Sequence, residues 1–188
     1  IFNTGTGTDD DGLIVKLGNT SATVVSSTNH FISFETSGIG IVGSVQGSGG
    51  TGVTYATSGI ADFAEYLKKD ENQAVEFGSV LCIDERGLVA PCDNNNIKVI
   101  GVASENPGFL GGENLGNKSI PVALVGQVYT KVSNINGNIK PGDPLASSSI
   151  PGVVIKATKA GQIVGKALEE SNGFIKYIIA PHEDKILG

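Results

Sequence analysis

Two carboxylates in the middle of the chain have residue types and a spacing that could do chemistry. Asp62 and Glu65 are three residues apart, which would place them on one side of a short helix expected over about residues 60–70. They follow a glycine-rich run directly, and such a flexible segment could be presented to them. The pattern therefore suggests either a hinge or a site of self-processing.

Each carboxylate also has a structural explanation. With Ser58 as a candidate N-cap, Asp62 would lie near the positive end of the helix dipole. Glu65 could pair with Lys68 or Lys69 on the helix surface, an interaction of about 0.3 kcal/mol. General acid–base catalysis needs a positioned target as well as two acids, so physical arguments alone favour the structural roles.

The composition excludes several classes of function. The chain has 188 residues, 27 of them glycine, with no Met or Trp and a net charge of −6. It carries no block of Lys or Arg that could follow a phosphate backbone, so we expect no nucleic-acid partner. No apolar run approaches the roughly 18 residues of a membrane span. Because Met is missing, Ile1 is not a natural start, and we expect a fragment of a longer protein.

The cysteines and serines give few candidates for a metal site or a nucleophile. Cys82 and Cys92 are ten residues apart around a predicted turn, a spacing that permits a cross-hairpin disulfide or two buried thiols. Both histidines lie far from these cysteines, so zinc would have too few ligands, and we expect no metal and no cofactor. The serine run at residues 147–149 has no recommended histidine partner and is interpreted as a turn.

Residues 1–58 read as a glycine-rich stem of short strands. Alternation of apolar and polar residues is clearest at 13–17, 30–35 and 39–46. Such a segment has too few large side chains to close its own core, and identical neighbouring chains could cover its strand edges. We therefore expect an intertwined homo-oligomer. The alternative is a small glycine-rich strand layer packed on the downstream domain.

Residues 75–188 repeat themselves after the short helical segment at 59–74. Residues 77–81 correspond to 141–145, and residues 98–105 correspond to 162–169, both with an offset of 64 residues. Each unit reads as a glycine turn followed by short strands. The predicted fold is therefore mainly β, with two pseudo-repeats packed into one barrel or sandwich.

The sequence also carries a family resemblance. Residues 58–67 read Ser-Gly-Ile-Ala-Asp-Phe-Ala-Glu-Tyr-Leu, and the β motifs at 99–108, 121–128 and 139–145 follow in order. This arrangement resembles the intramolecular-chaperone autoproteolytic domain that ends some phage neck-appendage and tail-fibre proteins. It is also similar to C-terminal domains of large bacterial surface proteins. The likeness covers roughly residues 40–180.

The resemblance implies a C-terminal module of a homotrimeric fibre, on a virion or a cell surface, that helps three chains register and fold. In some relatives the chain is cut near this point, at most once per chain. The resemblance then implies Asp62 and Glu65 as the acid–base pair. It places the scissile bond in or just before a cleavage region of four residues, Thr57, Ser58, Gly59 and Ile60.

Three functions of different classes follow. The leading one is a structural and assembly module of a fibre whose partner is the chain itself. The second is an active self-cleaving peptidase. The third is a fibre tip that binds a host-surface receptor or glycan. An aromatic content of 6% argues against the third, because sugar sites favour aromatic platforms.

Overall fold

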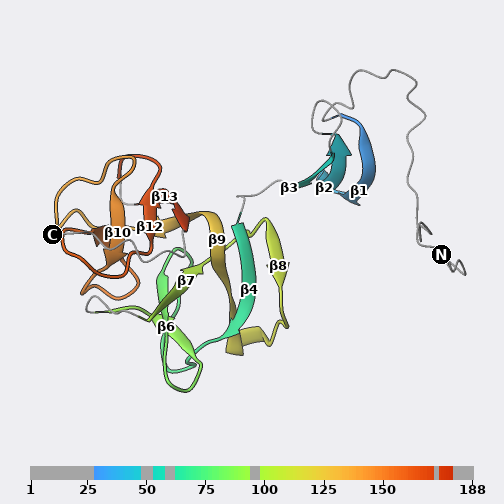
Figure 1. The fold of residues 1–188 in the computed structure, drawn as a ribbon. Coiled ribbons are helices and arrows are strands. Elements are labelled where there is room, and N and C mark those ends of the chain that lie inside the picture. The colour runs from blue at the N-terminus through green and yellow to red at the C-terminus, as the bar shows by residue number, and fades with distance from the viewer. Residues whose placement is uncertain (1–27, 48–52, 58–61, 94–97, 172–173, 180–188) are drawn as a thin grey trace, which may run out of the picture. The chain divides into compact units, whose positions relative to one another are not determined.

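The computed structural model describes residues 28–47, 53–57, 62–93, 98–171 and 174–179 (Figure 1). The chain divides into two compact units, residues 1–58 and 59–188. Within the described residues there is no α-helix, and the one helical segment is a 3₁₀ turn at Gly116–Lys118. The prediction of a mainly β fold is confirmed. No helix in the described part of the chain is long and apolar enough to cross a membrane.

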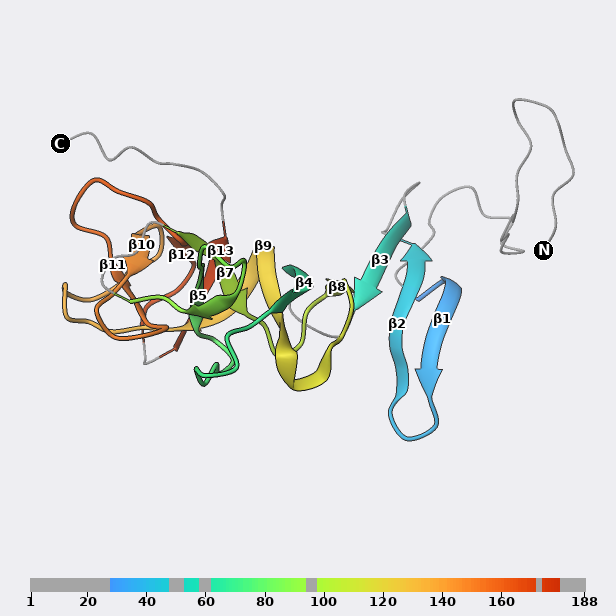
Figure 2. The same cartoon turned by 90° about the horizontal axis from the view of Figure 1, so that it is seen from below.

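The first unit contains a three-stranded antiparallel sheet in the order β1-β2-β3. Its strands are β1 (His30–Thr36), β2 (Gly40–Gly47) and β3 (Val53–Thr57). A tight turn joins β1 to β2 (Figure 2) and ends at Gly40, whose φ of 87° favours glycine. Several large apolar side chains of this sheet are exposed: Ile32, Phe34, Ile41 and Tyr55. The predicted strand at 13–17 lies outside the described residues.

The second unit contains ten strands in one connected sheet. The strands are β4 (Asp62–Lys68), β5 (Val80–Ile83), β6 (Val89–Pro91), β7 (Val99–Ala103), β8 (Phe109–Gly111), β9 (Ser119–Lys131), β10 (Pro144–Ser147), β11 (Val154–Lys156), β12 (Gly165–Ala167) and β13 (Phe174–Ile179). The hydrogen-bonded order is β11-β10-β12-β13-β9-β7-β5-β6, and β4 joins β9 to β8. This path of described strands does not close on itself, so the fold is sandwich-like and the barrel alternative is wrong.

The predicted helix over residues 60–70 is wrong, because Asp62–Lys68 forms strand β4. This strand lies between β8, to which it is parallel, and β9, to which it is antiparallel (Figure 1). Its first residues alternate between buried and exposed positions, as the two-residue period of a strand requires. Pairing along both edges therefore overrides the three-residue spacing that suggested a helix.

The two pseudo-repeats have the same internal pairing. In the first, β5 lies between β6 and β7, and in the second, β10 lies between β11 and β12. The Gly78 N–H donates to the Ala103 carbonyl at 2.8 Å, and 64 residues later the Gly142 N–H donates to the Ala167 carbonyl at 2.8 Å. Both glycines have positive φ, 80° and 88°. The repeated sequence therefore encodes the same glycine turn and strand pairing twice.

The core consists of two clusters that share the central strand β9. Consecutive residues of β9 point to opposite faces, and Val122 and Ala123 accordingly belong to different clusters. The larger cluster contains Val80, Cys82, Cys92, Val102, Ala123, Val128, Ile139, Leu145, Val154, Val164 and Ala167. The smaller contains Leu81, Val89, Ala103, Ile120 and Val122. A disulfide joins Cys82 to Cys92 within the larger cluster, which decides between the two predicted states of these cysteines.

Candidate functional site

Strand β4 holds the two predicted catalytic carboxylates on opposite faces. Asp62 pairs with Gly126 of β9 and is 1% exposed, whereas Glu65 is exposed and pairs with Gly111 of β8. Residues three apart in a strand are about 10 Å apart and point in opposite directions. The expectation that the two carboxylates share one side is therefore wrong, and within one chain they cannot hold the same water molecule.

Asp62 is fixed by one hydrogen bond and has one oxygen left over. The Gly108 N–H, from the loop between β7 and β8, donates to Asp62 Oδ1 at 2.9 Å. Asp62 Oδ2 is buried and has no hydrogen-bond partner among the described residues. A buried carboxylate oxygen without a donor is costly and rare in native proteins, and one explanation for such exceptions is a catalytic role. Asp62 is thus held in one position with a free acceptor.

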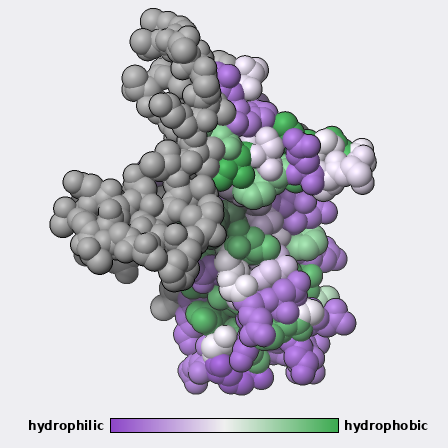
Figure 3. Space-filling model, turned by 90° about the vertical axis from the view of Figure 1, so that its right-hand side faces the viewer, coloured by the Kyte–Doolittle hydropathy of each residue, from purple (hydrophilic) through white to green (hydrophobic). Residues whose placement is uncertain are grey.

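The face of β4 that carries Glu65 also exposes apolar side chains. Phe63 lies opposite Phe109 of β8 and Val125 of β9, and these three residues form an apolar strip across adjacent strands. They are 58%, 55% and 45% exposed, and the two phenylalanine rings are 5.6 Å apart between centroids. On the face drawn in Figure 3, apolar residues also form small groups between hydrophilic ones. Exposed strips of this kind are typical of interaction surfaces.

Most of the predicted cleavage region lies outside the described residues. Thr57 is the last residue of β3, where its backbone pairs with Gly43 of β2. Ser58, Gly59 and Ile60 are not described. In the sequence this region ends two residues before Asp62, so the buried carboxylate directly follows it along the chain.

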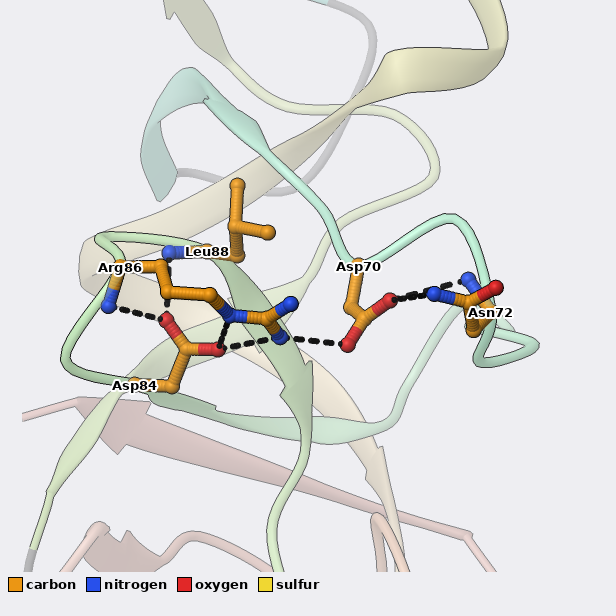
Figure 4. Close-up of polar contacts among 5 residues, drawn as sticks. All are labelled: Asp70, Asn72, Asp84, Arg86 and Leu88. Atoms are coloured by element: carbon orange, nitrogen blue, oxygen red, sulfur yellow. Dashed lines mark hydrogen bonds and ion pairs between the residues drawn. The ribbon is translucent and has the colours of Figure 1, made fainter.

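A charged cluster that the sequence did not reveal connects the end of β4 to the turn between β5 and β6 (Figure 4). Arg86 Nη2 donates to Asp70 Oδ2 at 2.7 Å, and Arg86 Nε donates to Asp84 Oδ2 at 2.8 Å. The Leu88 and Arg86 backbone N–H groups donate to Asp84 Oδ1 at 3.0 and 2.8 Å. The turn between β5 and β6 was predictable from its glycine. No local sequence pattern indicates that Arg86 would pair with Asp70, which is 16 residues away.

These contacts change the acidity of both carboxylates. The pKa of Asp84 is lowered, first by the hydrogen bond from the Leu88 backbone N–H and then by that from Arg86. The pKa of Asp70 is lowered, first by the hydrogen bond from the Asn72 backbone N–H and then by that from Arg86. The cluster is therefore a set of charged groups satisfied by one another, as expected for a structural clamp.

Two cavities lie away from β4's buried carboxylate. One of about 320 Å³ adjoins the Arg86 cluster and mixes cationic with acidic side chains. The other, of about 460 Å³, adjoins residues 147–149, where Ser148 Oγ accepts from the Ile150 N–H at 3.0 Å within a turn. In the part of the chain that the structure describes, no group of three or more His, Cys, Asp or Glu is placed to hold a metal ion.

Comparison with known proteins agrees with the resemblance predicted from the sequence. Residues 15–118, more than half of the chain, match the Peptidase_G2 family, described as the IMC autoproteolytic cleavage domain. This match includes both Asp62 and Glu65. Among curated proteins, none matches the chain.

Two solved structures from bacteriophage phi29 are similar to this chain. The gene product 12 C-terminal fragment has 17% identity and a TM-score of 0.46, over 63% of this chain and 98% of the fragment. The pre-mature gene product 12 has 15% identity and a TM-score of 0.48, over 74% of this chain and 24% of that longer protein. The family match carries the assignment: this chain belongs to the Peptidase_G2 family of IMC autoproteolytic cleavage domains.

Proposed function

We propose that this chain is the C-terminal assembly module of a phage fibre, that it forms a homotrimer on the virion, and that it cuts itself once. The cut falls in the cleavage region, residues 57–60. Membership of an autoproteolytic domain family supports the self-cleavage. The exposed apolar side chains of β1, β2 and β3 support the association of chains, because one copy of this sheet leaves them uncovered.

The observation that carries the proposal is the state of Asp62. It is buried, held by the Gly108 N–H, and left with a second carboxylate oxygen that has no donor among the described residues. It also follows the cleavage region directly in the sequence. A positioned carboxylate with a free acceptor is suited to activate water or to protonate a leaving amine.

The chemistry is hydrolysis of one peptide bond. One carboxylate removes a proton from water as the water oxygen bonds to the carbonyl carbon, and the carbon–nitrogen bond then breaks. The leaving amine takes a proton from the second acid. Asp62 is the carboxylate proposed for one of these roles. Glu65 lies on the opposite face of β4 and cannot fill the other role within the same chain. Each chain is cut at most once because the bond belongs to the enzyme itself.

Substitution of Asp62 by Asn tests this function. Asn keeps the Oδ1 acceptor for the Gly108 N–H and the side-chain volume but loses the carboxylate. In a chain extended upstream, we expect cutting of Asp62→Asn to be at least about 100-fold slower than that of the wild type. The mass of the denatured chain reports cutting, and the native mass reports assembly, expected at three chains.

Asp93→Asn is the matched control, because Asp93 is an exposed aspartate outside β4. It should be cut at the wild-type rate. Equal cutting of Asp62→Asn and wild type, with both assemblies intact, would show that Asp62 is not catalytic. An assembly of a number other than three chains would contradict the proposed trimer.

A further inference from the structure

We infer that the second pseudo-repeat carries a binding pocket for a small anionic carbohydrate, a sugar whose charge is a phosphate or a carboxylate. The pocket is the cavity of about 460 Å³ that adjoins residues 147–149. This inference goes beyond the proposed function and does not depend on it, because neither Asp62 nor the cleavage region takes part in the pocket.

The cavity lies where the second pseudo-repeat lacks the crosslink of the first. Ala146 is the counterpart of Cys82 at the 64-residue offset. Ala157, one residue beyond that offset, is the counterpart of Cys92, because their backbone N–H groups donate to the first residues of the equivalent strands β10 and β5, at 2.8 and 2.9 Å. Both alanines line the cavity. Where one half of the fold has a disulfide, the other half therefore has two short side chains in the wall of a hollow.

The size and the lining of the cavity suit a small polar ligand. Sites for small molecules typically have volumes of about 300–1,000 Å³. The lining combines Ile135 and Ile150, which are 69% and 45% exposed, with the exposed hydroxyl residues Ser149 and Thr158. Among the described residues that line the cavity, none is aromatic. A neutral sugar would find no aromatic platform here, so charge and hydrogen bonds must supply the affinity.

Two lysines give the cavity its charge, and no described residue that lines it is acidic. Lys156 is paired with Asp143 at 2.8 Å, which balances its charge. Lys159 is exposed and makes no ion pair within the described part of the chain. This cationic hollow contrasts with the net charge of −6 of the chain. Since a lysine ammonium binds phosphate and carboxylate groups through charge-assisted hydrogen bonds, the ligand is expected to be an anion.

The wall of the cavity also contains a polar atom without a partner. Gln162 Oε1 is buried and has no hydrogen-bond donor among the described residues, which is costly for an amide oxygen. The Gln162 side chain as a whole is half-buried, so its amide can turn toward the cavity. There it would accept a hydrogen bond from a ligand hydroxyl. A ligand with both a hydroxyl and an anionic group therefore satisfies Gln162 and Lys159 together.

Calorimetric titration of the full chain tests this inference with four probes: glucose 6-phosphate, glucuronate, glucose and inorganic phosphate. We expect glucose 6-phosphate or glucuronate to bind, and the tighter of the two identifies the anion. Glucose should bind at least about tenfold more weakly, because it lacks the charge-assisted hydrogen bond to Lys159. Inorganic phosphate should also bind more weakly than glucose 6-phosphate, because it carries no sugar hydroxyl for Gln162.

Variants locate the binding. Lys159→Gln should weaken binding of the charged sugar at least about tenfold. Lys118→Gln is the matched control, because it removes the same charge at an exposed position outside this cavity, and it should bind as the wild type does. Ala157→Leu fills the cavity without changing the charge and should also weaken binding. The thermal unfolding midpoint of each variant without ligand establishes that it is folded.

Four results would overturn the inference. They are no binding of either charged sugar to the wild type, equal binding of glucose and the charged sugars, equal binding of the charged sugar to folded Lys159→Gln and wild type, and a loss of binding in Lys118→Gln as large as in Lys159→Gln. Inorganic phosphate binding as tightly as glucose 6-phosphate would reduce the pocket to a simple anion site and overturn the carbohydrate assignment. None of these results bears on self-cleavage, which is measured separately by the mass of the denatured chain.

Discussion

Gly101 must be a residue without a Cβ, because strands β7 and β9 come very close together at this position. It lies in β7, where that strand pairs with β9. A Cβ at this position would be 2.2 Å from the Ala123 carbonyl oxygen and 2.8 Å from Val122 Cγ1. The first of these atoms belongs to backbone and cannot move without shifting β9. The side-chain hydrogen of glycine is therefore needed here for packing, since this residue is not among the glycines with positive φ.

Gly101→Ala should lower the free energy of unfolding by at least about 1–3 kcal/mol, because overpacking forces backbone shifts. Gly161→Ala is the matched control, since no atom lies within 4 Å of the Cβ it would add. Denaturant unfolding at equal chain concentration measures both. A Gly101→Ala chain as stable as Gly161→Ala would show that β7 and β9 are farther apart than described.

The residues of the candidate site were predictable to different degrees. The motif around Asp62 and Glu65 marked both carboxylates, because their order along the chain is a property of the sequence. Their placement on opposite faces was not predictable, because three-residue spacing fits one helix face and β4 becomes a strand only by pairing with β8 and β9. Gly108, the hydrogen-bond donor to Asp62, is 46 residues away and carries no local signal.

At the scale of elements, the Arg86 clamp ties the end of β4 to the β5–β6 turn. The lowered pKa values of Asp70 and Asp84 mean that the folded state favours their charged forms. Their stabilisation is fully present above the ordinary aspartate pKa of about 3.9 and is lost as pH falls through the lowered values. The Asp84 side chain is 39% exposed and the Asp70 side chain 11%, so salt weakens the contribution of Asp84 more than that of Asp70.

Arg86→Gln should make the loss of stability below about pH 4 less steep, because part of the pKa lowering comes from the guanidinium. Lys159→Gln removes the same charge at an exposed position and serves as the control. The measurement is the free energy of unfolding as a function of pH. Parallel curves for Arg86→Gln and the control below pH 4 would mean that the clamp does not contribute.

The elements themselves were largely predictable where the pattern was local or repeated. Strands β1 and β2 match the alternation at 30–35 and 39–46, and the 64-residue offset relates β5 to β10 and β7 to β12. The 13-residue strand β9 contains the β motif at 121–128. The failure to close into a barrel was not predictable, since closure depends on strand order across the whole unit.

At the scale of the whole molecule, the two pseudo-repeats share their pairing but differ in one covalent bond. The disulfide between Cys82 and Cys92 ties β5 to the end of β6. The positions 64 residues later are Ala146 and Lys156, which cannot form such a bond. In the chain-entropy description, a crosslink over a loop of this length stabilises by about 3 kcal/mol. One half of a repeated fold is thus crosslinked and the other is not.

This difference should appear as unequal local opening. Amide hydrogens of β10 and β12 should exchange with deuterated solvent faster than those of β5 and β7, because the half without the crosslink can open while the rest stays folded. Mass spectrometry of peptides from each half measures the rates, and reduction of the disulfide should bring them together. Equal rates before reduction would contradict this expectation. Within one repeated fold, the crosslinked half would then stay folded while the other half opens first.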